Sequence, residues 1–204
     1  MDWSLLHSLN DFMVGHDGIE DPLLFYVEIS EALFAATLVI VFLLARGPAH
    51  AAWRRATVAA ALSAGVALLI GKLISELVDR ARPFVADPGG VHLFAAHAPD
   101  PGFPSDHATA AFAIATAIVL RKRGWGAVAL IAAAVLSIGR VALGIHFPSD
   151  VLAGAALGSL VAIALWWQPL RSRIDALADL LGRPWDALVE RAGQLVRVAL
   201  VRKT

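Results

Sequence analysis

Five long apolar stretches are the feature that most constrains how this chain folds. They cover roughly residues 24–45, 57–79, 106–120, 125–143 and 150–168. A helix needs about 20 mainly apolar residues to cross the hydrocarbon core of a bilayer. The stretches are rich in alanine and leucine and lack the alternation of barrel strands, so each predicts a membrane-spanning helix. The third has the fewest apolar residues, and we expect its helix to extend into the polar residues at either end.

The composition supports a membrane protein and excludes several other classes. Hydrophobic residues make up 58 % of the chain, whereas an ordinary soluble domain has about 45–50 %. The formal net charge is zero, which argues against a general nucleic-acid binder. The chain has no cysteine, so disulfides, thiolate catalysis and cysteine-ligated metals are excluded. The first 30 residues lack the pattern of a cleavable signal peptide, so we expect insertion through the internal spans.

Basic residues mark one side of the predicted membrane domain. No lysine or arginine precedes Arg46, and cations gather at 46–56, at 121–124 and in the tail. These three segments alternate correctly across five spans, so the positive-inside rule predicts that they are cytoplasmic. The loop 80–105 and the turn 144–149 then face outward, as does the N-terminus. The tail cations are Arg171, Arg173, Arg183, Arg191, Arg197, Arg202 and Lys203.

The predicted fold class is all-α, an integral membrane bundle of about five transmembrane helices. Residues 1–22 have a helical apolar stripe and are expected to lie in the outer interface. Residues 23–168 form the transmembrane domain. Residues 169–204 form an amphipathic tail, read as a cytoplasmic surface helix or an oligomer contact, in which Pro184 should break or kink the helix. We therefore expect a multi-pass protein of the plasma (inner) membrane with a cytoplasmic C-terminus.

Two short polar clusters lie where apolar segments meet loops, and the predicted topology puts both on the outer face. In the second cluster, Arg140-x5-His146-x3-Asp150, His146 and Asp150 share one face if a helix starts at this turn. A carboxylate on one ring nitrogen would fix the tautomer and leave the other nitrogen free to attack. The alternative is a histidine that caps the helix beside an interfacial aspartate. Arg140, at the end of the preceding span, favours the catalytic interpretation.

The first cluster, Pro104-Ser105-Asp106-His107, opens the third span. A helix N-terminus offers free N–H groups and a positive dipole end, which suit a phosphate. Ser105 is a good N-cap, and it could cap the helix and bind phosphate together. His107 in the first turn could donate a proton to a leaving oxygen. The alternative for His107 is a solvated interfacial histidine.

Further cations lie upstream, in and after the second span. A lone Lys72 inside a span costs roughly 2.5–3.5 kcal/mol, so it either pairs with Glu76 one turn later or directs its ammonium at the phosphate. Arg82, followed by Pro83, is a phosphate candidate because its planar fork binds oxyanions at two points. Arg80 is a neighbouring candidate.

The remaining titratable residues fit no clear site. Glu28 and Glu31 lie three apart in the first span and could pair with Lys72, Arg80 or Arg82, or lie near the headgroups. His92 and His97 in the outer loop could touch substrate. The histidines match no metal-ligand spacing, and the sequence predicts neither a metal nor a cofactor.

These residues resemble the type 2 phosphatidic acid phosphatase superfamily. Its pattern is Lys-x6-Arg-Pro, then Pro-Ser-Gly-His, then Ser-Arg-x5-His-x3-Asp. The stretches Arg80-Ala-Arg82-Pro83-Phe84, Phe103-Pro-Ser-Asp-His107 and Gly144-Ile-His146-Phe-Pro-Ser-Asp150 look most like the bacitracin-resistance type of undecaprenyl-diphosphate phosphatase. Asp106, where the wider pattern has glycine, is a cue for that subgroup. Three features depart from the pattern: nine residues rather than six separate Lys72 from Arg82, Gly139 replaces the serine before Arg140, and Asp106 adds a negative charge beside the phosphate site.

The resemblance implies a mechanism for the site. His146 would attack the terminal phosphorus to give a phosphohistidine, with Asp150 orienting it, and His107 would protonate the departing lipid phosphate. The phosphoryl oxygens would be held by the helix N-terminus and by a set of polar side chains. That set is Arg140, Arg82, Ser105 and Lys72, with Asp106 and Arg80 as further members of the phosphate site.

The implied substrate is undecaprenyl diphosphate, cleaved to the monophosphate and inorganic phosphate, a step of cell-wall peptidoglycan biogenesis. The same machinery would hydrolyse phosphatidic acid, phosphatidylglycerol phosphate or other prenyl diphosphates. A hypothesis from another class is a non-catalytic lipid-phosphate binder or transporter. It would need neither the His146–Asp150 spacing nor a second histidine, and both are present. The spans exclude a soluble haloperoxidase.

Overall fold

The computed structural model describes residues 1–201, apart from the side chains of 196 and 198–201. Residues 202–204 of the predicted tail, with Arg202 and Lys203, lie outside the described residues. The described chain is all-α, which confirms the predicted class. The elements are α1 (Asp2–Met13), α2 (Asp17–Leu44), the 3₁₀ turn η1 (Pro48–His50), α3 (Ala51–Val78), α4 (Pro83–Ala86), α5 (Asp106–Val119), α6 (Arg123–Ala142), α7 (Pro148–Trp166) and α8 (Leu170–Val201).

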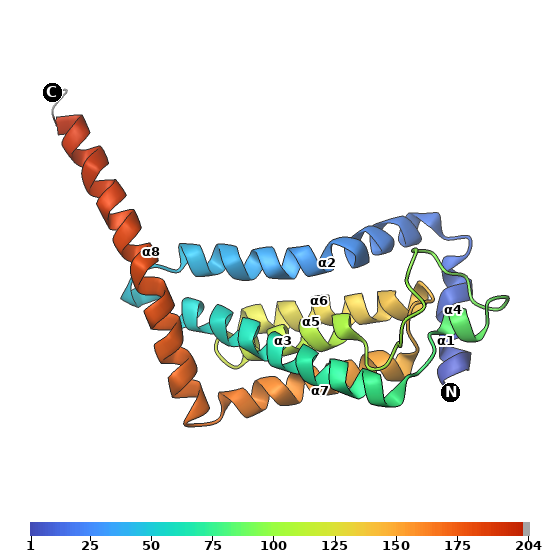
Figure 1. The fold of residues 1–204 in the computed structure, drawn as a ribbon. Helices are drawn as coiled ribbons and strands as arrows, with labels where there is room; N and C mark the ends of the chain where they lie inside the picture. Colours follow the sequence, from blue (N-terminus) through green and yellow to red (C-terminus); the bar gives the residue numbers. More distant parts are fainter. Residues whose placement is uncertain (202–204) are drawn as a thin grey trace.

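Helices α2, α3, α6 and α7 run alongside α5, and α5 packs against α3, α6 and α7 (Figure 1). Within the described residues, four helices are long and apolar enough to cross a membrane: α2, α3 in the segment Pro48–Ala86, α6 and α7. The predicted polar extension of α5 was wrong, because this helix has only 14 residues. Pro104 cannot continue a helix upstream, and the chain turns at Leu120 into α6.

Close approach of α5 to α7 brings the two polar clusters together. A Cβ on Gly154 would lie 2.6 Å from the Ser105 carbonyl oxygen, and one on Gly158 would lie 2.2 Å from that of Thr109. Small residues spaced by four allow membrane helices to approach this closely. The first turn of α5 is therefore held against the first turns of α7.

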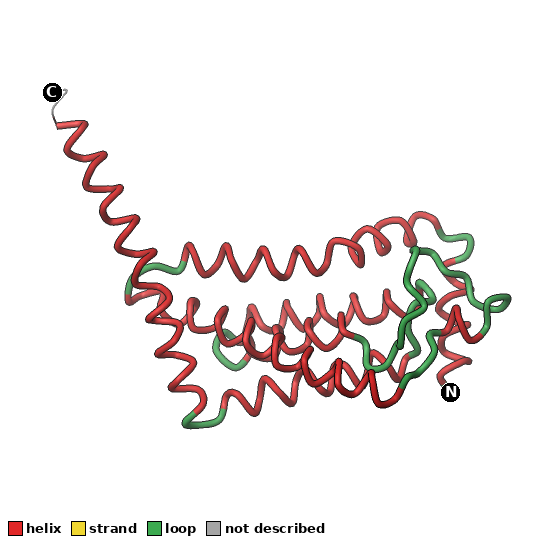
Figure 2. The backbone as a smooth tube through the Cα atoms, viewed as in Figure 1, coloured by secondary structure: helices red, strands yellow, loops and turns green. Residues whose placement is uncertain are grey.

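One end of the bundle, where α5 begins and α6 ends, carries His107 and His146; we call it the histidine end. Helix α1 crosses this end and the long loop 79–105 folds over it (Figure 2). Asn10, buried in α1, donates to the carbonyl oxygens of His92 at 2.8 Å and Ala142 at 2.9 Å. Only residues 2–13 of the segment 1–22 form this helix, since α2 already begins at Asp17.

The opposite end carries Arg54, Arg55 and Arg121; we call it the arginine end. Helix α8 crosses it (Figure 1). Arg54 donates both terminal nitrogens to the Asp186 carboxylate at 2.8 and 2.7 Å. Two further pairs join Arg55 to Asp179, at 3.0 and 2.6 Å, and Arg121 to Asp175, at 2.8 Å.

Of the break or kink predicted at Pro184, the break does not occur, because helix α8 continues through this residue. A proline removes one backbone donor and crowds the preceding turn. Contacts on both sides of Pro184 hold the helix in place. Asp179 and Asp186 bind the arginines of α3, and the Trp185 indole donates to the Leu43 carbonyl at 2.9 Å.

Candidate active site

His146 lies in the tight turn between α6 and α7. Gly144 turns the chain with φ +77°, and a Cβ there would lie 2.6 Å from the His92 carbonyl oxygen. The Nδ1 atom of His146 lies 3.0 Å from the carbonyl oxygen of Gly102. A carbonyl can only accept, so Nδ1 carries the hydrogen and Nε2 keeps a free lone pair.

That lone pair faces two guanidinium groups. Nε2 of His146 lies 3.0 Å from Nη1 of Arg82 and 3.1 Å from Nη2 of Arg140. The residue is 2 % exposed. Burial lowers the pKa of His146 well below its ordinary value, and the charges of Arg140 and Arg82 lower it further. The ring is therefore neutral at neutral pH, as a nucleophile must be.

Asp150 supports the site differently from the predicted direct pairing with the imidazole. Its Oδ2 lies 3.6 Å from Nδ1 of His146, beyond a hydrogen bond, and accepts instead from the Phe147 backbone N–H at 2.8 Å. The prediction placed Asp150 close to His146, but His146 lies in the turn before α7, so the two residues do not share a helix face. At the third position of α7, however, the carboxylate turns back to the free N–H groups of the helix start. It thus fixes the turn, while the Gly102 carbonyl fixes the imidazole tautomer.

Arg80 does not face His146, so its predicted place among the phosphate ligands is not supported. Its Nη1 donates to Asp150 Oδ1 at 2.7 Å and its Nη2 to Asp2 Oδ2 at 3.0 Å. The guanidinium also lies over the Phe147 ring, 4.3 Å from the centroid. Both carboxylates bind this guanidinium and keep it away from the imidazole of His146. Arg80 therefore braces Asp150.

The start of α5 places a hydroxyl without a hydrogen-bond partner, that of Ser105, beside this turn. The Ser105 N–H donates to the Asp150 carbonyl at 3.0 Å, which joins the two helix starts. Ser105 occupies the N-cap position without making a side-chain cap bond. Its buried Oγ, like Nε of Arg140, has no hydrogen-bond partner among the described residues. A buried donor without a partner is costly, and a phosphate oxygen would satisfy both.

His107, in the first turn of α5, pairs with Glu31, a residue whose role the sequence left open. Nε2 of His107 lies 3.1 Å from Oε1 of Glu31 on α2. The sequence suggested Lys72, Arg80 or Arg82 as partners of Glu31, and none of these forms an ion pair with it in the described chain. A carboxylate in the middle of a membrane helix is expensive unless it is paired. No local spacing signals this contact, because α2 and α5 are far apart in sequence.

The loop 79–105 contributes two residues to the site: His97, which the sequence suggested as a possible substrate contact, and Asp100, which no motif indicated. Nε2 of His97 lies 3.1 Å from Nη2 of Arg140. Nε of Arg82 donates to both the carbonyl and the carboxylate of Asp100, each at 3.0 Å. Burial raises the pKa of Asp100, but the hydrogen bond and charge of Arg82 outweigh it, so the pKa lies below its usual value. The loop thereby orients both arginines. The proximity of His97 to Arg140 could not be read from the sequence.

Lys72 and Asp106 stand apart from these contacts. Lys72 is exposed on α3 and, within residues 1–201, forms no ion pair with Glu76. Asp106 is also exposed and makes no hydrogen bond to a described side chain. The described residues contain no cluster of three or more His, Asp or Glu side chains that could hold a metal ion. The site is thus built from one neutral imidazole, two guanidinium groups, a free hydroxyl and a second histidine.

Comparison with known proteins shows which family and fold the chain resembles. Residues 56–174 match the model of the PAP2 superfamily. The chain is 25 % identical to the undecaprenyl-diphosphatase BcrC of Bacillus subtilis (strain 168), over 94 % of this chain and 95 % of that protein. It is 32 % identical to the putative undecaprenyl-diphosphatase YbjG of Escherichia coli (strain K12), over 60 % of this chain and 63 % of that protein. The crystal structure of a transmembrane PAP2-type phosphatidylglycerolphosphate phosphatase from Bacillus subtilis is similar in fold, with a TM-score of 0.60 at 20 % identity, covering 80 % of this chain and 83 % of that one.

Proposed function

The chain belongs to the PAP2 superfamily and is a membrane lipid phosphatase, and from this premise we propose that it hydrolyses undecaprenyl diphosphate to undecaprenyl phosphate and inorganic phosphate. The observation that carries the chemistry is the Nε2 lone pair of His146, held 3.0 and 3.1 Å from two guanidinium groups. The relatives that support the substrate are the two undecaprenyl-diphosphatases, one of which is similar over 94 % of the chain.

In the first step, Nε2 of His146 attacks the terminal phosphorus and a P–N bond forms. The bond from phosphorus to the bridging oxygen breaks, and its electron pair leaves with the lipid phosphate. His107 gives a proton to that oxygen, as a general acid. Arg82, Arg140 and Ser105 hold the three equatorial oxygens, where negative charge spreads in the transition state.

In the second step, water attacks the phosphohistidine on the side vacated by the lipid phosphate. His107, now neutral, accepts a proton from this water. The P–N bond breaks, the electron pair returns to His146, and inorganic phosphate leaves. The Gly102 carbonyl keeps Nδ1 protonated in both steps, so the same nitrogen serves as nucleophile and leaving group.

We further propose that the arginine end faces the cytoplasm and the histidine end the outside. Arg46, Arg54, Arg55, Arg121, Lys122 and Arg123 gather at the arginine end, as the positive-inside rule requires of a cytoplasmic side. The chain has no cysteine, so single-cysteine variants can test this in whole cells. A membrane-impermeant maleimide should label Ala98→Cys and spare Gly124→Cys; the reverse pattern would invert the topology.

The function is tested by phosphate release from undecaprenyl diphosphate, measured with purified protein in detergent and a chelator. Wild type should turn over. His146→Ala should lose activity entirely, while His16→Ala, on the exposed turn between α1 and α2 where the ring contacts Phe12, should match wild type. Phosphatidic acid and phosphatidylglycerol phosphate serve as competing substrates. Release from either of these but not from undecaprenyl diphosphate would overturn the substrate, and release from none would overturn the proposed function.

A further inference from the structure

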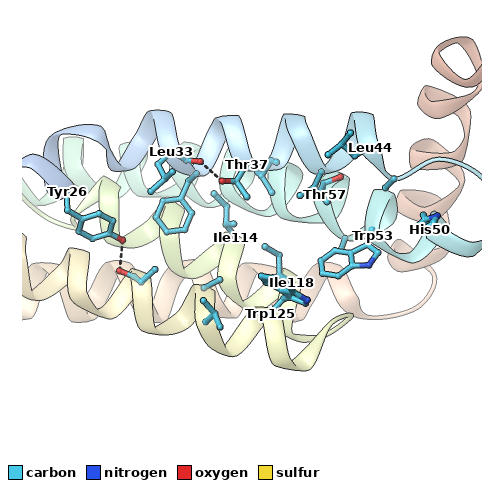
Figure 3. A pocket seen from close by; sticks show the side chains of 18 residues that line it. Tyr26, Leu33, Thr37, Leu44, His50, Trp53, Thr57, Ile114, Ile118 and Trp125 are labelled. Atoms are coloured by element: carbon cyan, nitrogen blue, oxygen red, sulfur yellow. Dashed lines mark hydrogen bonds between the residues drawn. The ribbon is translucent and has the colours of Figure 1, made fainter. Parts of the chain in front are cut away.

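An apolar cavity of about 610 Å³ lies between α2, α3, α5 and α6 (Figure 3). Its polar side chains are already satisfied by backbone carbonyls. Thr37 Oγ1 donates to Leu33 at 2.7 Å, Thr57 Oγ1 to Arg54 at 2.8 Å, and the Tyr26 hydroxyl to Ala132 at 2.8 Å. Apart from His50, Trp53 and Trp125, the remaining lining residues present hydrocarbon, so the chemistry of the walls suits an aliphatic ligand.

The cavity exists because α2 packs loosely. Only 11 % of the most apolar window of α2 is buried, compared with 44 % for α6. Its Phe34 touches the buried cores on both sides, and its Leu38 and Phe42 touch one of them. The cavity therefore opens toward the bilayer, and a lipid chain can enter from the side.

The position of the cavity relative to the catalytic histidines identifies its occupant. An in-line displacement places the leaving oxygen opposite Nε2 of His146, on the side of His107. The lipid is attached to that oxygen and must continue past His107. Ile114, which lines the cavity, lies two turns beyond His107 on α5, about 10 Å along the helix. On α2, the lining residues Leu33 and Phe34 follow directly after Glu31, the partner of His107.

We propose that this cavity binds the proximal isoprene units of the leaving lipid phosphate, with the Glu31–His107 pair at its mouth and the Trp53 and Trp125 rings at its far end. This inference rests on the proposed function, since it takes the lipid to be the leaving group. The two tryptophan rings lie 6.0 Å apart in an edge-to-face arrangement. The rest of a longer chain extends between α2 and α6 into the bilayer.

The length of the cavity determines how many isoprene units it can bind. Its lining on α2 runs from Tyr26 to Leu44, about 27 Å of helix, and the part beyond Glu31, from Leu33 to Leu44, spans about 17 Å, which takes roughly three to four isoprene units. The rate should therefore rise from dimethylallyl to farnesyl diphosphate and change little from geranylgeranyl to undecaprenyl diphosphate. A site that bound only the diphosphate would show no such plateau.

The experiment fills the cavity and compares substrates of different length. Ala129 lines the cavity on α6, whereas Ala127 lies on the same helix, exposed and outside it. We measure kcat/KM of wild type, Ala129→Phe and Ala127→Phe with dimethylallyl, farnesyl and undecaprenyl diphosphate. The inference predicts that A129F lowers the farnesyl-to-dimethylallyl ratio of kcat/KM by about tenfold or more, while A127F leaves that ratio at the wild-type value.

Other outcomes separate the hypotheses. An unchanged ratio in A129F would overturn the inference and assign the cavity to bulk lipid, or to a second copy of the chain if cross-linking of wild type traps a dimer at Trp125. An equal loss for both substrates, with a lower thermal unfolding temperature, would show general damage; Ala132→Leu then repeats the ratio test with a smaller side chain. No phosphate release by wild type from any diphosphate would instead refute the proposed function.

Discussion

The two ends of this bundle use arginine in opposite ways. At the arginine end, each of Arg54, Arg55 and Arg121 meets an aspartate of α8 at 2.6–2.8 Å. At the histidine end, Arg140 has no carboxylate within ion-pair distance in the described chain, and it donates to two histidines while its Nε has no partner. These three arginines of the arginine end are therefore neutralised by carboxylates, whereas Arg140 at the histidine end is available to bind an anion.

The difference shows how one residue type serves stability and ligand binding. A guanidinium paired with a carboxylate gives a fixed contact between helices, and its charge is already balanced, although Nε of Arg54 and Nε of Arg121 make no hydrogen bond in the described chain. An unpaired, buried guanidinium costs free energy in the empty enzyme, and a phosphate recovers that cost on binding. Arg82 lies between these cases, because Asp100 holds its Nε while its Nη1 faces His146.

The largest effect should come from Arg140→Ala. We expect kcat/KM for lipid diphosphate to fall about 10²–10³-fold, the usual cost of removing one donor to a transition-state oxyanion. The acidic limb of kcat/KM should also move to higher pH, because removal of this cation relieves a repulsion that lowers the pKa of His146. A pH–rate profile measures both. Arg140→Lys, which keeps the charge but not the fork, should recover part of the rate and the wild-type limb.

Glu31→Gln should have the next largest effect, through the positioning of His107. Loss of the carboxylate 3.1 Å from Nε2 removes what holds the protonated ring toward the leaving group, and we expect about a tenfold loss of kcat on lipid diphosphate. p-Nitrophenyl phosphate, whose leaving group needs no proton, should be hydrolysed at the wild-type rate. Glu28→Gln, on the exposed face of the same helix, is the matched control. An equal loss on both substrates would assign Glu31 a structural role.

Arg54→Ala should leave activity unchanged and lower stability. Loss of the bidentate bond to Asp186 should cost about 1–2 kcal/mol of unfolding free energy, seen as a lower thermal unfolding temperature. The hydrogen bond to Arg54 lowers the pKa of Asp186, so its contribution is complete above the ordinary value of 3.8 and is lost as the pH falls below it. The difference from wild type should therefore shrink in acid. Arg123→Ala, exposed at the same end, should change neither quantity, and a stable R54A would undo the contrast between the ends.

Much of this architecture follows from local sequence patterns. The apolar stretches predicted the spanning helices, and the spacing of His146 and Asp150 predicted that these two residues lie close together. Features for which the sequence allows two alternative local interactions were harder to predict. Asp150 could bind either the imidazole or the helix-start N–H groups, and geometry at the third helical position favoured the latter. Pro184 was predicted to break or kink α8, but the helix continues through it, held by contacts on both sides.

Long-range contacts could not be read from the sequence. The Gly102 carbonyl that fixes the tautomer of His146 and the Glu31 carboxylate beside His107 come from segments with no motif of their own. Their positions depend on how α2 and the 79–105 loop fold onto the site. The role of Arg80 changed for the same reason, since Asp2 at the start of α1 reaches it only in the folded chain.

Ser105→Ala distinguishes the two interpretations of Ser105. Its Oγ is buried without a partner, so Ser105→Ala should lower kcat/KM by about tenfold through a lost phosphate contact without lowering the thermal unfolding temperature. An N-cap serine replaced by alanine would instead cost about 1 kcal/mol of stability and spare the rate. Ser63→Ala is the matched control, because the Ser63 hydroxyl on α3 is also buried without a partner but lies outside the site. If S63A and S105A behave alike in both measurements, the Ser105 hydroxyl does not bind phosphate. The difference between the two ends then rests only on how their arginines are paired.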